Sequence, residues 1–104
     1  MQNAHDVAAY ILTRLGPIPA MRLQKLVYYS QYWSLSWEQR PLFHESIEMS
    51  LIGPVVSDLR EKLPELLEEI KEWPLGDESK LDQYARETVD VVISLHCTPF
   101  LRSE

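Results

Sequence analysis

The sequence predicts a mainly α-helical fold, a compact single-domain bundle of about four or five helices with a short extended segment near residues 42–52. Three segments, 4–15, 20–37 and 79–96, place apolar residues at the three- and four-residue spacing of an amphipathic helix. The length of 104 residues makes one domain, spanning residues 1–104, the default. Hydrophobic residues make up 45% of the chain and charged residues 25%, which is the mix of a folded globular protein and not of a disordered one.

The first helix has a clear beginning and end. Its apolar stripe consists of Val7, Ala8, Ile11, Leu12 and Leu15. Asn3 can cap its start, and Gly16-Pro17 should end it. Two prolines in the following segment, IPAM, predict a short rigid connection to the second helix.

The second helix, residues 20–37, is unusual because aromatic residues occupy several of its faces. We expect its core stripe to consist of Leu23, Leu26, Val27, Ser30, Trp33 and Trp37. The other faces still carry Tyr28, Tyr29 and Tyr32, whose rings can pack against a surface while the hydroxyl groups stay hydrated or bonded. The helix should therefore be covered on most sides, either by its own chain or by a partner.

The next segment changes its period and then returns to helix. Ile47, Met49 and Leu51 alternate with polar residues, which predicts a short strand before a break at Gly53-Pro54. Ser57 can cap a helix there, and Pro64 predicts a break near Leu63.

Two further helices are predicted after this break. Residues 64–73, PELLEEIKEW, favour a short acidic helix that buries Leu66, Leu67 and Ile70. The last helix, 79–96, has the following apolar stripe: Leu81, Ala85, Thr88, Val89, Val92, Ile93 and His96.

Composition predicts a cytoplasmic protein that binds neither membranes nor nucleic acids directly. No apolar run approaches the roughly 18 residues of a membrane span, the N-terminus lacks the features of a signal peptide, and the lone Cys97 excludes an intrachain disulfide. The formal net charge is −6, and residues 55–104 carry the whole excess, with six basic and twelve acidic side chains. Such a surface repels phosphate and suits a basic protein partner, although a merely solvated acidic surface explains the same pattern.

The residues do not form a recognisable catalytic, metal or cofactor site. His96 and Cys97 are neighbours, but side chains of successive helical residues point about 100° apart, so they suit a base and nucleophile poorly. His5 and His44 are isolated from other metal ligands. With three glycines and no glycine-rich motif, a phosphate-binding loop is not expected either. The sequence therefore predicts a protein that is not an enzyme.

Four motifs in order resemble a known family. VAAYIL is followed by LQKLVYYSQYWSL, then by RPLFHESIE and GPVV. This order resembles the SocA-like antitoxin family, the Panacea domain, which is common in bacterial toxin–antitoxin loci and prophages. The resemblance is strongest over residues 5–56, above all at 23–31 and 53–56. The family continues beyond the motifs present here, so the resemblance implies a shortened member that lacks the family's C-terminal segment.

The resemblance implies a mostly helical cytoplasmic domain that binds a toxin protein directly and neutralises it. In one member of the family the antitoxin acts as an adaptor that hands its toxin to a protease. It places the protein-binding residues at Lys25, Tyr28, Tyr29, Gln31, Tyr32, Gly53 and Pro54. An alternative is that Tyr28 and Tyr29 pack under residues 40–56 while Lys25 bonds to a backbone carbonyl or a carboxylate. An alternative function is a phage or mobile-element inhibitor of a bacterial defence nuclease, in which the acidic residues 58–90 imitate nucleic acid. The tyrosine-rich helix also leaves room for a homodimer.

Overall fold

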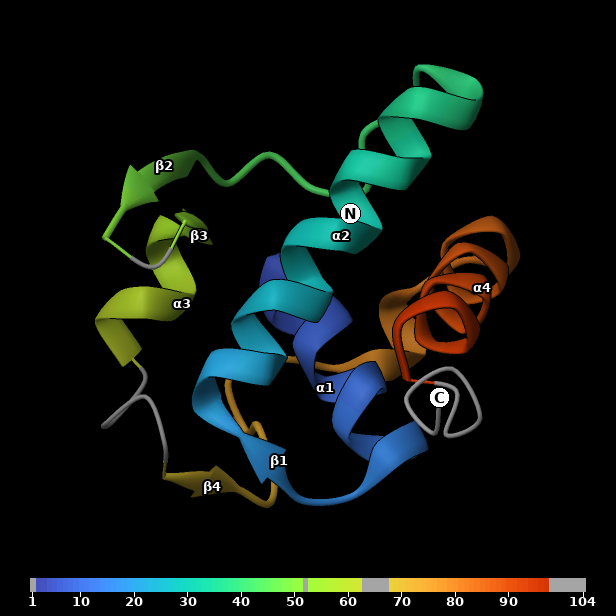
Figure 1. Ribbon diagram of the computed structural model, residues 1–104. Helices are drawn as coiled ribbons and strands as arrows, with labels where there is room; N and C mark the ends of the chain where they lie inside the picture. The colour runs from blue at the N-terminus through green and yellow to red at the C-terminus, as the bar shows by residue number, and fades with distance from the viewer. Residues whose placement is uncertain (1, 52, 63–67, 98–104) are drawn as a thin grey trace, which may run out of the picture.

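The computed structural model describes residues 2–51, 53–62 and 68–97 (Figure 1). Its first helix, α1 (Ala4–Leu15), has the predicted bounds. Asn3 Oδ1 accepts a hydrogen bond from the Asp6 N–H at 2.9 Å, and the Asp6 carboxylate accepts one from the Asn3 N–H at 2.9 Å. This reciprocal capping box satisfies two backbone donors at the helix start. The helix ends at Gly16, whose φ of 79° suits a residue without a side chain.

The second helix, α2 (Ala20–Glu38), lies at the centre of the fold. In Figure 1 the hairpin of strands β2 and β3, together with helix α3, lies on one side of α2, and helix α4 lies on the other. Helix α2 contacts α1, α4 and β3. Helix α2 therefore contacts both other long helices and the β2–β3 hairpin.

The buried face of α2 is rotated from the predicted stripe. Leu23, Leu26, Val27 and Ser30 are buried as predicted. The prediction was wrong for Trp37, which is 42% exposed, because the last turns of α2 extend past the neighbouring helices (Figure 1). Gln24, Gln31 and Ser34 are buried in its place.

The predicted strand is present and forms half of a hairpin. Strand β2 (Ile47–Ser50) pairs antiparallel with β3 (Gly53–Val56), with Ile47 opposite Val56 and Ser50 opposite Gly53. The predicted break at Gly53 lies at the start of β3, where Gly53 has a φ of 105°. Helix α3 (Ser57–Lys62) begins where a helix start was predicted.

The prediction of a helix over residues 64–73 is wrong for residues 68–73, the part of this segment that the structure describes. Glu69–Ile70 form strand β4, which pairs antiparallel with β1 (Ile18–Pro19). Ile70 is buried as predicted, but from a strand. Leu66, Leu67 and the predicted break near Leu63 lie outside the described residues.

The last helix, α4 (Gln83–Cys97), starts later than predicted. A short 3₁₀ helix, η1 (Glu78–Lys80), precedes it, because the Asp77 carboxylate accepts hydrogen bonds from the Ser79 N–H and hydroxyl at 3.0 and 2.6 Å. Its predicted stripe is confirmed at Ala85, Thr88, Val89 and Val92, all of which are buried.

The mainly helical prediction is confirmed, since four α-helices account for most of the described residues. Two small antiparallel sheets, β1–β4 and β2–β3, add more strand than the single extended segment that was expected. The core cluster draws on α1, α2 and α4 and on the buried pair Leu42 and Phe43. Among the described residues, no helix is long and apolar enough to cross a membrane.

Candidate protein-binding surface

Five aromatic side chains of α2 form a continuous row of ring contacts, in which Tyr29 and Trp33 also pack against the core cluster. We call Tyr28, Tyr29, Tyr32, Trp33 and Trp37 the aromatic face. Neighbouring ring centroids in this row lie 5.1 to 6.1 Å apart, and the rings of Trp33 and Trp37 stack at 24°. Tyr32 is 46% exposed and Trp37 is 42% exposed, while the other three rings are half-buried. The row therefore exposes the rings of Tyr32 and Trp37, and the neighbouring half-buried rings pack against them.

His96 of α4 fixes one edge of the aromatic face. Its imidazole stacks on the Tyr29 ring, with centroids 4.1 Å apart and planes 6° from parallel. The indole N–H of Trp33 donates a hydrogen bond to His96 Nε2 at 3.2 Å. Only an unprotonated nitrogen can accept this bond, and burial lowers the pKa of His96, which favours the same neutral state. One neutral histidine thus holds two rings of α2.

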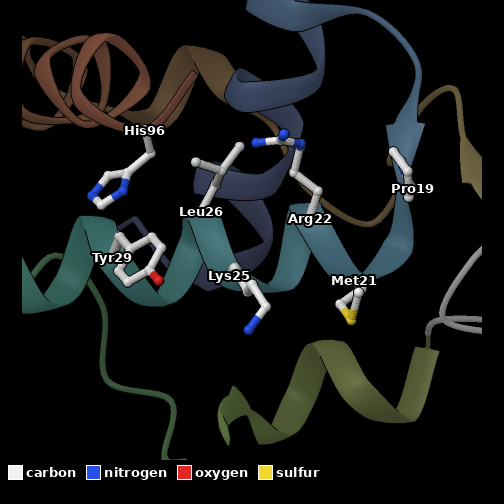
Figure 2. A pocket seen from close by; sticks show the side chains of 7 residues that line it. All are labelled: Pro19, Met21, Arg22, Lys25, Leu26, Tyr29 and His96. Carbon is white, nitrogen blue, oxygen red and sulfur yellow. The ribbon is translucent and has the colours of Figure 1, made fainter. Parts of the chain in front are cut away.

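A cavity of about 400 Å³ opens beside Tyr29 and His96. Its remaining lining residues are Pro19, Met21, Arg22, Lys25 and Leu26. Figure 2 shows Arg22, Leu26 and His96 above α2 in the view, and Lys25 and Met21 below it. The lining thus combines two cations with apolar side chains and a stacked ring pair, and the described residues that form it include no carboxylate.

The structure brings four of the predicted site residues together. Tyr28, Tyr29 and Tyr32 belong to the aromatic face, and Lys25 and Tyr29 line the cavity. The Tyr29 ring stacks on His96 and packs against the core cluster, so Tyr29 also has a structural role. The alternative in which Tyr28 and Tyr29 pack under residues 40–56 stays a prediction.

The other three predicted residues lie elsewhere. Gln31 is buried, with 7% of its surface exposed. Its Nε2 donates to the Phe43 carbonyl at 2.9 Å, and its Oε1 accepts from the Leu42 N–H at 2.7 Å. The prediction that Gln31 lies at the partner surface therefore does not fit its position, which is structural. Gly53 and Pro54 are half-buried in β3 and do not line the cavity.

The sequence analysis assigned Trp33 and Trp37 to the core and His96 to the core stripe of its own helix. Trp33 does pack against the core cluster, half-buried, whereas Trp37 is exposed. The contact of His96 with Tyr29 and Trp33 was not predicted. The polar sequence SLSWEQR at the end of the helix was a sign that Trp37 is exposed. No local signal pairs His96 with Tyr29 and Trp33, because that pairing depends on how α4 crosses α2.

Comparison with known proteins gives one match. A family model described as antitoxin SocA-like, Panacea domain, matches residues 23–95, which includes the whole aromatic face, Lys25 and the β2–β3 hairpin. No curated protein and no solved structure matches the chain. Within the described residues, no group of three or more His, Cys, Asp or Glu side chains could hold a metal ion.

Proposed function

The chain belongs to the SocA-like antitoxin family, the Panacea domain, and from this premise we propose that it neutralises a toxin protein by binding it directly. The family supports a role connected with toxin–antitoxin systems and favours a non-enzymatic one. The observation that carries the proposal is the aromatic face, which presents Tyr32 and Trp37 nearly half exposed on a helix inside the family match.

Aromatic residues in such a row suit a protein interface. Tyrosine and tryptophan supply large contact area while few rotatable bonds are immobilised on binding, and they are enriched among the residues that dominate binding energy. Single exposed apolar residues are ordinary on a protein surface, but a contiguous row marks an interaction site more often. Two rings of this row are already held by His96. The face should therefore lose little conformational freedom when a partner covers it.

The first experiment identifies the partner and then tests the face. Tagged protein is used to capture its partner from the native host, and the partner is purified and titrated by calorimetry. The double variant Tyr32→Ala/Trp37→Ala should weaken binding at least about tenfold, because hot-spot aromatic residues typically contribute more than 1 kcal/mol each. Leu75→Ala is the matched control, since Leu75 is also exposed, at 53%, but lies outside the aromatic face. Equal affinity of both variants would contradict the proposal.

The same titration separates the acidic-decoy alternative. A partner held by the acidic residues would lose affinity steeply as salt is raised and would be indifferent to the aromatic variants. A partner held by the aromatic face would keep most of its affinity as salt is raised and would lose affinity in the Tyr32→Ala/Trp37→Ala variant. Degradation assays of the partner then test whether the protein hands its toxin to a protease. The molar mass of the complex tests whether the protein acts as a homodimer.

A further inference from the structure

The β2–β3 hairpin, which lies on the side of α2 away from α4 (Figure 1), has one edge that is closed to further strands. This closed edge belongs to β3, which contacts α2. Gln24 of α2 bonds to both backbone groups of Val56, to its N–H at 2.8 Å and to its carbonyl at 3.3 Å. Pro54, two residues earlier in the strand, has no N–H to donate. A third strand therefore cannot add along β3.

The open edge belongs to β2. Antiparallel strands alternate between residues that bond to the neighbouring strand and residues whose N–H and C=O point away from it. Val56 directs its two groups toward Gln24, so Ile47, directly opposite, must direct its own groups away from β3. Met49, two residues further on, has the same orientation. Within the described part of the chain, no hydrogen bond reaches the backbone of Ile47 or Met49 from this outer side.

The side chains on this edge are apolar and exposed. Ile47 is 37% exposed, Met49 is 75% exposed and Leu51 is fully exposed. They share one face of the strand, since alternate side chains point the same way, and Glu48 points to the other face. Proteins usually protect an edge strand with several charges, with proline or with a covering segment. Strand β2 has Glu48 as its only charged residue and no proline, so its edge is a template for another strand.

Charge argues against a second copy of the chain as that strand. Two β2 strands that paired antiparallel through Ile47 and Met49 would place Glu48 directly opposite its own copy. Like charges at this position destabilise a sheet. Arg60 lies 3.3 Å from the Glu48 carboxylate, but this pair is exposed and offsets little of the repulsion. A foreign strand with a basic or neutral residue opposite Glu48 avoids the repulsion, and the net charge of −6 favours a basic partner.

We propose that β2 receives an extended segment of a partner protein as an antiparallel third strand, bonded to the backbone of Ile47 and Met49. Apolar residues of that segment lie beside these two side chains, and a basic or neutral residue lies opposite Glu48. In this mode of recognition the main-chain bonds supply affinity and the alternate side chains supply specificity. The surface shares no residue with the aromatic face, and the inference holds whether or not the partner is a toxin.

Amide hydrogen exchange, followed by NMR, tests the open edge in the free protein. The N–H groups of Ile47 and Met49 should exchange at least about tenfold faster than that of Glu48, which lies opposite Val55 and bonds within the hairpin. Slow exchange at Ile47 and Met49 would overturn the proposal, because the edge would already be covered. Protection that grows with protein concentration would overturn it too, because the occupant would then be a second copy.

A peptide probe tests the added strand itself. The fluorescein-labelled heptapeptide Val-Thr-Val-Lys-Val-Thr-Val is titrated with the full chain, and its fluorescence anisotropy is measured. In the proposed register its third and fifth residues bond to β2, and its lysine lies opposite Glu48. Methylation of the amide nitrogens of the third and fifth residues should weaken binding at least about tenfold. Methylation of the fourth and sixth, which point away from β2, is the matched control and should change affinity less than about twofold. Any other pattern would overturn the proposal.

Two variants of one residue separate the backbone of β2 from its side chain. Met49→Pro removes the N–H on the open edge, and proline is tolerated on an edge strand where that N–H faces solvent. Met49→Ala keeps the N–H and removes only the side chain. The proline variant should bind the probe at least about tenfold more weakly than the alanine variant. If Met49→Pro does not fold, the methylated peptides on the wild-type protein still decide the question. Equal binding by two folded variants, or a dissociation constant of the unmethylated probe above about 1 mM, would overturn the proposal.

The two proposals can fail separately. If the host partner depends on Tyr32 and Trp37 while the two methylated peptides bind alike, the inference is wrong and the proposed function stands. If the probe adds to β2 but no captured protein depends on the aromatic face, the proposed function is wrong and the inference stands.

Discussion

The imidazole of His96 lies flat on the ring of Tyr29, with centroids 4.1 Å apart and planes 6° from parallel. The same imidazole accepts a hydrogen bond from the Trp33 indole at 3.2 Å. One side chain of α4 therefore stands between the aromatic face and the cavity, and its protonation state bears on both.

Acidification should destabilise the protein through His96. Burial lowers the pKa of His96 in the folded state below its usual value of about 6.5. The unfolded chain then binds a proton more readily than the folded one, so this contribution is fully present above pH ~6.5 and is lost as the pH falls below it. The free energy of unfolding, measured by urea titration between pH 7.5 and 5, should fall more steeply for the wild type than for His96→Gln, which keeps an acceptor but cannot be protonated there. Parallel slopes would show that His96 is not responsible.

Trp33→Ala should destabilise the protein by about 2 kcal/mol, below the roughly 3–5 kcal/mol typical of a fully buried aromatic residue. The indole is half-buried, stacks on Trp37 and donates to His96, so truncation removes packing on one side only. Trp33→Phe keeps a ring and should lose less. Chemical denaturation of both variants measures this difference, and an unchanged midpoint for Trp33→Ala would mean that the ring does not contribute to folding.

Gln31→Ala should cost about 2 kcal/mol or more, because it leaves the Leu42 N–H and the Phe43 carbonyl without their bonds inside the protein. The matched control is Gln83→Ala, whose side chain bonds to Glu87 at the surface and whose loss should stay within about 0.5 kcal/mol. Similar unfolding free energies for the two variants would indicate that Gln31 lies at the surface, as the sequence analysis expected.

Gly76→Ala should be among the most damaging small substitutions. A Cβ at Gly76 would lie 1.9 Å from the His5 carbonyl oxygen, which is backbone and cannot turn aside. Moving the loop away would also strain the hydrogen bond from the Asp77 N–H to the Asp6 carboxylate at 2.8 Å. We expect a loss of about 3 kcal/mol or more in the free energy of unfolding.

Gly53→Ala is the comparison for that variant. A Cβ there meets nothing within 4 Å, so only the backbone φ of 105° opposes the change. A loss of about 1–2 kcal/mol is expected from this strain. If Gly76→Ala lowered the thermal unfolding midpoint less than Gly53→Ala, Gly76 could not lie as close to the His5 backbone of α1 as the structure places it.

The sequence by itself determined the elements whose signals are local. The signals for the Asn3 cap of α1, the apolar stripe of α4 and the alternation in β2 each lie within one short segment, and each of these features was predicted. The reciprocal bond from Asp6 that completes the capping box was not predicted. Lys25 and the three tyrosines of α2 were expected at the candidate site because of the family resemblance of this helical motif, and their part in binding stays a prediction. Backbone capping and side-chain periodicity act over this short range, so a single segment contains the information.

Only the tertiary structure decided the features that need two distant segments. Glu69–Ile70 form a strand because Ile18–Pro19 offer a backbone edge, although the surrounding sequence favours a helix. Gln24 is buried because its amide bonds to both backbone groups of Val56, at 2.8 and 3.3 Å, which no pattern within α2 reveals. The cavity likewise depends on the packing of α4 against α2, which places His96 on the ring of Tyr29. A buried polar group or a strand edge becomes stable only when its hydrogen-bonding partner arrives, and that partner is chosen by the packing of the whole chain.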